Sequence, residues 1–201
     1  MRPYFALSVG LLFAVALVGC ASSPGAGEAE ATPCQPPPIV VPTLPAEIPE
    51  YLELDPATGL HITGAYQEID LHSYRLVVTG TVEHALSLTY DELRCLPRVE
   101  ATCALVCPGF FEDQGTWAGV PITHVLGLAG VQPEAIGLRL VSADGYDALA
   151  TLDMVESQGA FLAYEWAGEP LPILHGFPVR AVFPESSGSV WAKWLIRIEV
   201  Y

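Results

Sequence analysis

Short runs in which apolar and polar residues alternate dominate the second half of the chain, a pattern typical of β-strands. Residues 74–80 alternate in this way and stop at a glycine, and Leu86-Ser-Leu88 places two leucines on one face. The same reasoning predicts further strands over residues 99–106, 138–142, 160–165, 179–183 and 194–200. Strand structure is therefore expected throughout this part of the chain.

Three short helices are predicted between these strands. Thr89 and Glu92 have capping-box spacing, which predicts a helix that opens there and ends near Cys95. Residues 121–130 have proline at the start and glycine at the end, which predicts a second helix. Residues 152–157 are expected to form a third, short helix. Because strands outnumber short helices, the predicted fold class is α+β with mixed β-sheets.

The N-terminus has the pattern of a lipoprotein signal peptide, predicted over residues 1–19. Arg2 precedes an apolar run over residues 5–18, and Leu17-Val18-Gly19-Cys20 matches the bacterial lipoprotein cleavage signal. Cleavage leaves Cys20 free to carry lipid, and two or more acyl chains anchor a protein stably. We therefore expect an exported protein attached to the bacterial cell envelope through lipid; an uncleaved N-terminal anchor is the alternative.

Residues 20–51 are rich in Pro, Ala and Glu, which predicts a flexible tether, and residues 52–201 have the length of one domain. The net charge of −15 excludes nucleic acid as a partner, since such proteins need basic patches. It also argues against electrostatic adhesion to anionic lipid. A site for an anionic ligand must draw on the eight Lys and Arg residues, of which Lys193 is the only lysine.

The chain has five cysteines, and four remain once Cys20 is assigned to lipid. If the protein is exported, the remaining cysteines are in an oxidising compartment, where disulfides can persist. They are Cys34, Cys95, Cys103 and Cys107. No cysteine spacing is typical of haem attachment or of a zinc site. A thiol redox pair of Cys103 and Cys107 is a minor hypothesis, because their C-x-x-x-C spacing differs from C-x-x-C.

Two segments carry the remaining candidate chemistry. Cys107 begins a loop rich in Gly and Pro, and Trp117-Ala-Gly-Val-Pro121, ten residues on, is expected to be a turn. His175-Gly-Phe-Pro-Val-Arg180 is followed by Trp191-Ala-Lys-Trp194. Over residues 74–200 the chain resembles the molybdopterin-binding oxidoreductase domain shared by sulfite oxidase and the molybdenum-dependent methionine sulfoxide reductases.

The resemblance implies a sulfite-oxidase-type fold, a molybdenum–molybdopterin cofactor and Cys107 as the thiolate ligand of the metal. It implies that His175 and Arg180 contact the pterin and its phosphate, since arginine suits phosphate. It assigns Tyr146 to the substrate side of the metal. The other cofactor-binding residues that it implies are Asp144, Trp191, Ala192 and Lys193. If Cys107 holds the metal, Cys95 and Cys103 are expected to form a disulfide.

Three features depart from the sulfite oxidase pattern. Residues 59–71 show no equivalent of the pterin-binding segment that contains His and Asn, and Arg94, Arg98 and Arg139 have no matching context. Arg2 stands alone where exported proteins that carry this cofactor have twin arginines.

The main hypothesis is a lipid-anchored oxidoreductase that transfers an oxygen atom to or from a small substrate containing sulfur or nitrogen. Because no haem motif is present, electrons would pass to or from a separate protein partner. The alternative is a non-catalytic lipoprotein that binds a ligand or protein on the same fold.

Overall fold

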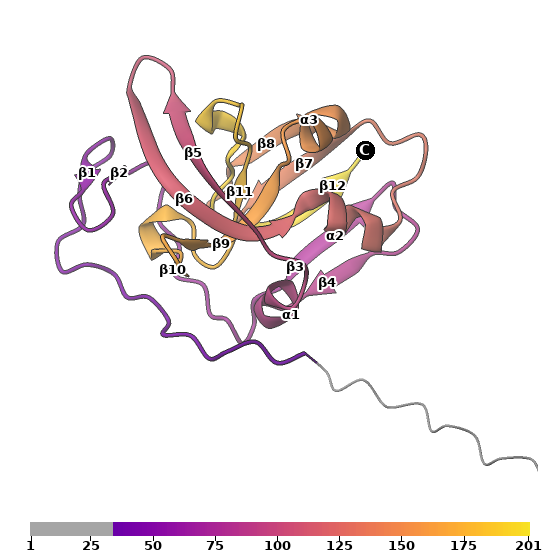
Figure 1. Ribbon diagram of the computed structural model, residues 1–201, viewed down its shortest axis with the longest axis horizontal. Helices are drawn as coiled ribbons and strands as arrows, with labels where there is room; N and C mark the ends of the chain where they lie inside the picture. The colour runs from indigo at the N-terminus through magenta and orange to yellow at the C-terminus, as the bar shows by residue number, and fades with distance from the viewer. Residues whose placement is uncertain (1–33) are drawn as a thin grey trace, which may run out of the picture. The chain divides into compact units, whose positions relative to one another are not determined.

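The structure is a computed structural model that describes residues 34–201 (Figure 1). The predicted signal peptide, Cys20 and the first part of the predicted tether lie outside the described residues. Within residues 34–201, no helix combines the length and apolar character needed to cross a membrane.

The described chain contains twelve strands and three α-helices. The strands are β1 (Leu54–Asp55), β2 (Leu60–His61), β3 (Leu76–Gly80), β4 (Leu86–Leu88), β5 (Val99–Cys107), β6 (Phe111–Pro121), β7 (Gly137–Ser142), β8 (Asp147–Thr151), β9 (Phe161–Trp166), β10 (Glu169–Pro170), β11 (Arg180–Val182) and β12 (Leu195–Val200). The helices are α1 (Tyr90–Arg94), α2 (Ile122–Ala129) and α3 (Leu152–Ser157), with the 3-10 turns η1 (Ile173–His175) and η2 (Gly188–Val190).

Two five-stranded sheets organise the fold, and β1 and β2 form a separate small hairpin. One sheet has the order β10-β9-β6-β5, with β11 also paired to β9; the other has the order β4-β3-β12-β7-β8. In the second sheet β12 runs parallel to β3 and antiparallel to β7. A single cluster of buried apolar side chains joins the two sheets with α2. The predicted α+β class with mixed sheets and short helices is confirmed.

Local sequence signals account for the helices. Thr89 caps α1: its hydroxyl accepts from the Glu92 amide at 3.1 Å, and the Glu92 carboxylate accepts from the Thr89 amide at 2.7 Å. These two bonds are the reciprocal bonds of a capping box. Helix α2 ends at Gly130, whose left-handed backbone (φ 68°) suits glycine. All three predicted helices are present within one residue of their expected ends.

The turn predicted at residues 117–121 is wrong, because this segment is the second half of strand β6. Gly119 permits the pairing: a Cβ atom there would lie 1.8 Å from the carbonyl oxygen of Leu162 on β9. The register of β6 against β9 shifts between Ala118 and Gly119, which identifies a β-bulge. Gly and Pro mark a bulge and a strand end here rather than a loop.

The expected Cys95–Cys103 disulfide is also wrong, since Cys95 at the end of α1 is bonded to Cys34. Cys103 lies on β5 and keeps a free thiol. Residues 34–51 contain no helix or strand, yet the disulfide and a 2.7 Å bond from Arg94 Nη2 to the Pro37 carbonyl attach them to the domain.

Candidate functional site

A cavity of about 390 Å³ lies beside the end of β5, and we call it the Cys107 cavity. Segments far apart in the sequence build it: the β5–β6 hairpin end, the β7–β8 turn, η2 and the residues after it, and the segment that follows β2. Its lining residues are Tyr51, Thr63, Gly64, Leu105, Cys107, Pro108, Phe111, Ser142, Asp144, Tyr146, Arg180, Gly188, Ser189, Trp191, Lys193 and Trp194.

Six of the eight residues assigned from the sequence line this one cavity, although they span more than eighty positions of the chain. They are Cys107, Asp144, Tyr146, Arg180, Trp191 and Lys193. His175 and Ala192 are buried nearby in sequence but do not line it.

The β5–β6 hairpin fixes the position of Cys107. Cys107 is the last residue of β5 and stands directly opposite Phe111 on β6. A bridge between Val106 and Ser187 brings η2 alongside this end of the hairpin. The thiol is therefore held between a rigid strand end and the segment that contains Trp191 and Lys193.

Cys103 lies on the same face of β5, four residues before Cys107. A strand rises about 3.3 Å per residue, so their Cα atoms are roughly 13 Å apart, whereas a disulfide needs less than about 7 Å. The hypothesis of a thiol redox pair is therefore incompatible with this hairpin. Burial raises the pKa of Cys103 to about 11, although the nearby positive charge of Arg180 opposes this.

Asp144 and Tyr146 belong to the turn that joins β7 to β8. The Tyr146 amide donates to Asp144 Oδ1 at 3.0 Å, which is the local turn expected for Asp-Gly-Tyr. The Tyr146 hydroxyl donates to the Ser189 carbonyl next to η2. Tyr146 thus connects two walls of the Cys107 cavity and remains partly exposed.

Arg180 begins β11 and is only 2% exposed. Its guanidinium carbon lies 4.6 Å from the ring centroid of Trp117 and 5.5 Å from that of Trp191, and Nη1 donates to the His175 carbonyl at 3.1 Å. Burial lowers the pKa of Arg180, while Cys103 and Asp113 act in the opposite direction. Arginine retains its proton in proteins, so this side chain is a fixed buried positive charge.

Lys193 is the second cation of the cavity. Its ammonium group donates to the carbonyls of Thr63 and of Leu174, the latter at 3.1 Å, and lies 4.3 Å from the ring centroid of Trp194. Burial first, and then the charge of Arg180, lowers the pKa of Lys193 well below its usual value; Asp144 works against this. The bond to Thr63 places the segment after β2 against the C-terminal motif.

Three successive carbonyls of η1 connect the two parts of the C-terminal motif. The Ile173 carbonyl accepts from Trp194 Nε1 at 2.7 Å, and the next two accept from Lys193 and from Arg180. Side chains from residues 180–194 therefore satisfy carbonyls of residues 173–175. This network explains why the motif folds as one unit.

His175 points away from the Cys107 cavity. Its Nε2 lies 2.9 Å from Asp55 Oδ2 and 2.9 Å from the Thr58 hydroxyl, on the β1–β2 hairpin. Burial lowers the pKa of His175 to about 4, so the imidazole is neutral at pH 7. Burial tends to raise the pKa of Asp55, but bonds from His175, the Ala57 amide and Thr58 outweigh it and the pKa is lowered.

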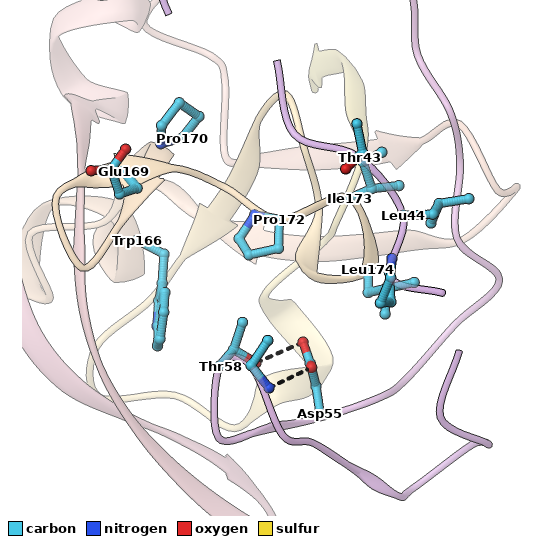
Figure 2. Close-up of a pocket in the computed structure, with 12 residues that line it drawn as sticks. Thr43, Leu44, Asp55, Thr58, Trp166, Glu169, Pro170, Pro172, Ile173 and Leu174 are labelled. Carbon is cyan, nitrogen blue, oxygen red and sulfur yellow. Dashed lines mark hydrogen bonds between the residues drawn. The ribbon is translucent and has the colours of Figure 1, made fainter. Parts of the chain in front are cut away.

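Asp55 and Thr58 line a second cavity of about 380 Å³ (Figure 2). Figure 2 shows the Asp55 carboxylate accepting hydrogen bonds within its own turn. The rest of this cavity is formed mainly by prolines and apolar side chains, with Trp166 at one side. His175 thus tethers the β1–β2 hairpin to the motif.

Sequence reasoning missed several residues of the Cys107 cavity. Thr63 and Gly64 lie in the segment where no equivalent of the family's pterin-binding stretch was found, and they contribute to its wall. Ser142 was passed over although it ends a predicted strand just before Asp144. Its hydroxyl is buried and has no hydrogen-bond partner among the described residues.

Comparison with known proteins identifies the class of this site. Residues 63–201 match the family model described as the oxidoreductase molybdopterin binding domain. The chain belongs to this family. The match includes every wall of the Cys107 cavity except Tyr51, and it confirms the resemblance to the molybdopterin-binding domain of oxidoreductases.

Individual relatives agree with this family. The chain is 34% identical over 131 residues to an uncharacterized oxidoreductase, YuiH, of Bacillus subtilis, a match that covers 65% of this chain and 66% of YuiH. It is 34% identical over 162 residues to mitochondrial sulfite oxidase of Macaca fascicularis, covering 66% of this chain and 30% of that protein.

A putative protein-methionine-sulfoxide reductase subunit, YedZ1, of Azospira oryzae is 31% identical over 131 residues, with 64% of this chain and 49% of the relative covered. Among solved structures, the sulfane dehydrogenase SoxCD from Paracoccus pantotrophus superposes with a TM-score of 0.65 at 25% identity, covering 77% of this chain and 50% of that one. This chain therefore spans about two thirds of YuiH, half of YedZ1 and less than a third of sulfite oxidase.

Proposed function

We propose that this protein is a molybdenum–molybdopterin-dependent oxidoreductase that transfers an oxygen atom to or from a small substrate containing sulfur or nitrogen. The observation that carries the proposal is the Cys107 cavity, where one thiol lies with two buried cations, Arg180 and Lys193. Thiolates are soft ligands suited to transition metals, and cations suit the phosphate of the cofactor.

The residues present fit this cofactor. Within residues 34–201, Arg180 Nε and the Ser142 hydroxyl are buried without partners, and both residues line the Cys107 cavity. Buried polar groups are almost always hydrogen-bonded, so these two atoms indicate a polar ligand. Arg180 would hold phosphate and Ser142 a polar atom of the pterin. When bound, the molybdenum centre supplies the oxygen-atom transfer and the electron chemistry.

The protein's own residues then have distinct roles. Cys107 would ligate the metal, and Asp144, Trp191 and Lys193 would complete the pterin pocket. Ala192 is assigned to the pocket on family resemblance alone, because it does not line the cavity. Tyr146, held by the Ser189 carbonyl at the cavity wall, faces the substrate side. His175 is assigned to the pterin on family resemblance alone, because its Nε2 is engaged by Asp55.

The cellular setting is part of the same proposal. Cleavage before Cys20 and lipidation there would attach the enzyme to the bacterial cell envelope, in the periplasm or on the outer face of a membrane, as the signal sequence indicates. A separate electron-transfer protein exchanges electrons with the site.

Cofactor content tests the proposal directly. Full-length protein purified from its native host should contain about one molybdenum and one pterin per chain, by elemental analysis and by the fluorescence of the oxidised pterin. It should also reoxidise reduced benzyl viologen with sulfoxides or N-oxides, or reduce ferricyanide with sulfite. Protein from the native host that lacks both molybdenum and pterin would refute the proposal and favour the non-catalytic binding lipoprotein.

A further inference from the structure

A His–Asp pair stands beside the Cys107 cavity and has no role in the proposed cofactor site. His61 Nδ1 lies 2.6 Å from Asp113 Oδ1, and the His61 backbone amide donates to Asp113 Oδ2 at 2.7 Å. Both carboxylate oxygens of Asp113 thus bind the same residue. The Asp113 side chain is 2% exposed and the His61 side chain 27% exposed, so a buried carboxylate orients an imidazole that reaches solvent.

Aromatic stacking connects this pair with Cys107. The His61 ring is stacked on the Phe111 ring, with centroids 4.5 Å apart and planes inclined by 10°. Phe111 lines the Cys107 cavity and stands directly opposite Cys107 across the hairpin. Opposed residues of an antiparallel pair have Cβ atoms roughly 4.5–5.5 Å apart. His61 therefore contacts the residue that faces the candidate metal ligand across the hairpin.

The hydrogen bonds fix which nitrogen can exchange a proton. A carboxylate only accepts, so Nδ1 carries the proton shared with Asp113. Within residues 34–201, Nε2 of His61 has no hydrogen-bond partner. This is the arrangement in which a carboxylate sets the tautomer of a histidine and leaves its other nitrogen to take up or release protons.

We propose that Asp113 orients His61 and that His61 passes protons between solvent and the Cys107 cavity. This inference rests on the proposed function. Removing an oxygen atom from a sulfoxide consumes two protons and two electrons and yields a thioether and water. The electrons come one at a time from the protein partner. Each proton leaves Nε2 toward the cavity, and solvent then reprotonates Nε2; the opposite reaction runs this path in reverse.

The charges around His61 are consistent with this role. Asp113 from β6 is the only acidic or basic side chain of residues 34–201 within ion-pair distance of His61. The buried charge of Arg180 also interacts with Asp113. Asp113 thus interacts both with a buried cation and with the His61 imidazole.

The experiment compares His61→Gln and Asp113→Asn with the parent holoenzyme. His84→Gln serves as the control, because its imidazole is exposed and it lies in the β3–β4 connection of the other sheet. Two readouts are used. The first is turnover of methyl p-tolyl sulfoxide by reduced benzyl viologen from pH 5 to pH 9. The second needs no substrate: the rate at which the viologen reduces the centre, followed by stopped flow over the same pH range.

General acid–base groups contribute roughly 10²-fold or more, so His61→Gln should slow both rates about 100-fold and flatten their pH profiles at full molybdenum and pterin content. Asp113→Asn should displace the pH profile, and added imidazole should partly rescue His61→Ala. His84→Gln should match the parent. Fully loaded His61→Gln with parental rates and pH profiles would overturn this inference alone. Parent protein without molybdenum and pterin would instead overturn the proposed function.

Discussion

Two cysteines on one face of one strand allow a matched test of the metal ligand. Cys107→Ser and Cys103→Ser each replace one sulfur atom of β5 by oxygen, four residues apart. If Cys107 is the ligand, only the first change alters the metal centre, because a hydroxyl is a harder and far less acidic donor than a thiol.

The burial of Cys103 and the position of Cys107 give the expected size of each effect on stability and turnover. With a pKa of about 11, Cys103 needs about 5 kcal/mol to become a thiolate at pH 7, which disfavours it as a ligand. Cys103→Ser places a hydroxyl in a half-buried apolar setting, at a cost of about 1–3 kcal/mol. For a domain of this length that predicts a melting temperature roughly 2–10 °C lower with turnover per molybdenum intact. Cys107→Ser should lower turnover by more than about 100-fold. Changing a residue that only hydrogen-bonds a metal ligand already costs roughly 10- to 100-fold, and Cys107 is the ligand itself.

The assay measures molybdenum and pterin per chain, turnover per molybdenum, the electron paramagnetic resonance signal of the half-reduced centre, and the melting temperature. Cys107→Ser should retain pterin but change the signal, since sulfur is lost from the metal. The reasoning is refuted if Cys103→Ser abolishes turnover and changes the signal while Cys107→Ser leaves both intact.

The remaining predictions concern the anchor, the cations and the response to acid. Cys20→Ala should leave the protein soluble after cell fractionation, because lipid is then absent; retention in the membrane pellet would contradict the lipoprotein assignment. Arg180→Ala should reduce pterin content tenfold to a hundredfold, since a charge-assisted bond contributes about 1.5–3 kcal/mol, and Lys193→Ala should reduce it less. Arg180→Ala should also lower the melting temperature through its lost carbonyl and Trp contacts, whereas unchanged pterin in the double variant would make both residues structural.

For His175, the folded pKa of about 4 lies below the ordinary value of 6.5, so the unfolded chain binds the proton first as pH falls. The free energy of unfolding should therefore decrease by about 3 kcal/mol between pH 6.5 and pH 4, and stay level above that range. Urea titrations of the apoprotein at each pH measure this free energy of unfolding. If the free energy of the His175→Gln variant decreases as steeply with falling pH, another group is responsible.

Local signals in the sequence determined most of the elements. The capping box at Thr89 and Glu92 and the glycine at 130 specify their helix ends through bonds within a few residues, so they can be read without knowing the fold. The motif residues Cys107, Arg180 and Lys193 were assigned through the resemblance of the chain to a known family. The structure shows that they line one cavity, and the family comparison shows the class of domain.

What the sequence could not determine depends on contacts between distant segments. Gly119 looked like a turn residue, but it is glycine because the carbonyl of Leu162 on β9 leaves no room for a Cβ atom. Cys95 pairs with Cys34 rather than Cys103 because chain topology, not spacing, brings two sulfurs together. His175 bonds Asp55 and His61 bonds Asp113 across 120 and 52 residues of chain. Such pairings follow from how the β1–β2 hairpin packs, and only the folded structure decides that.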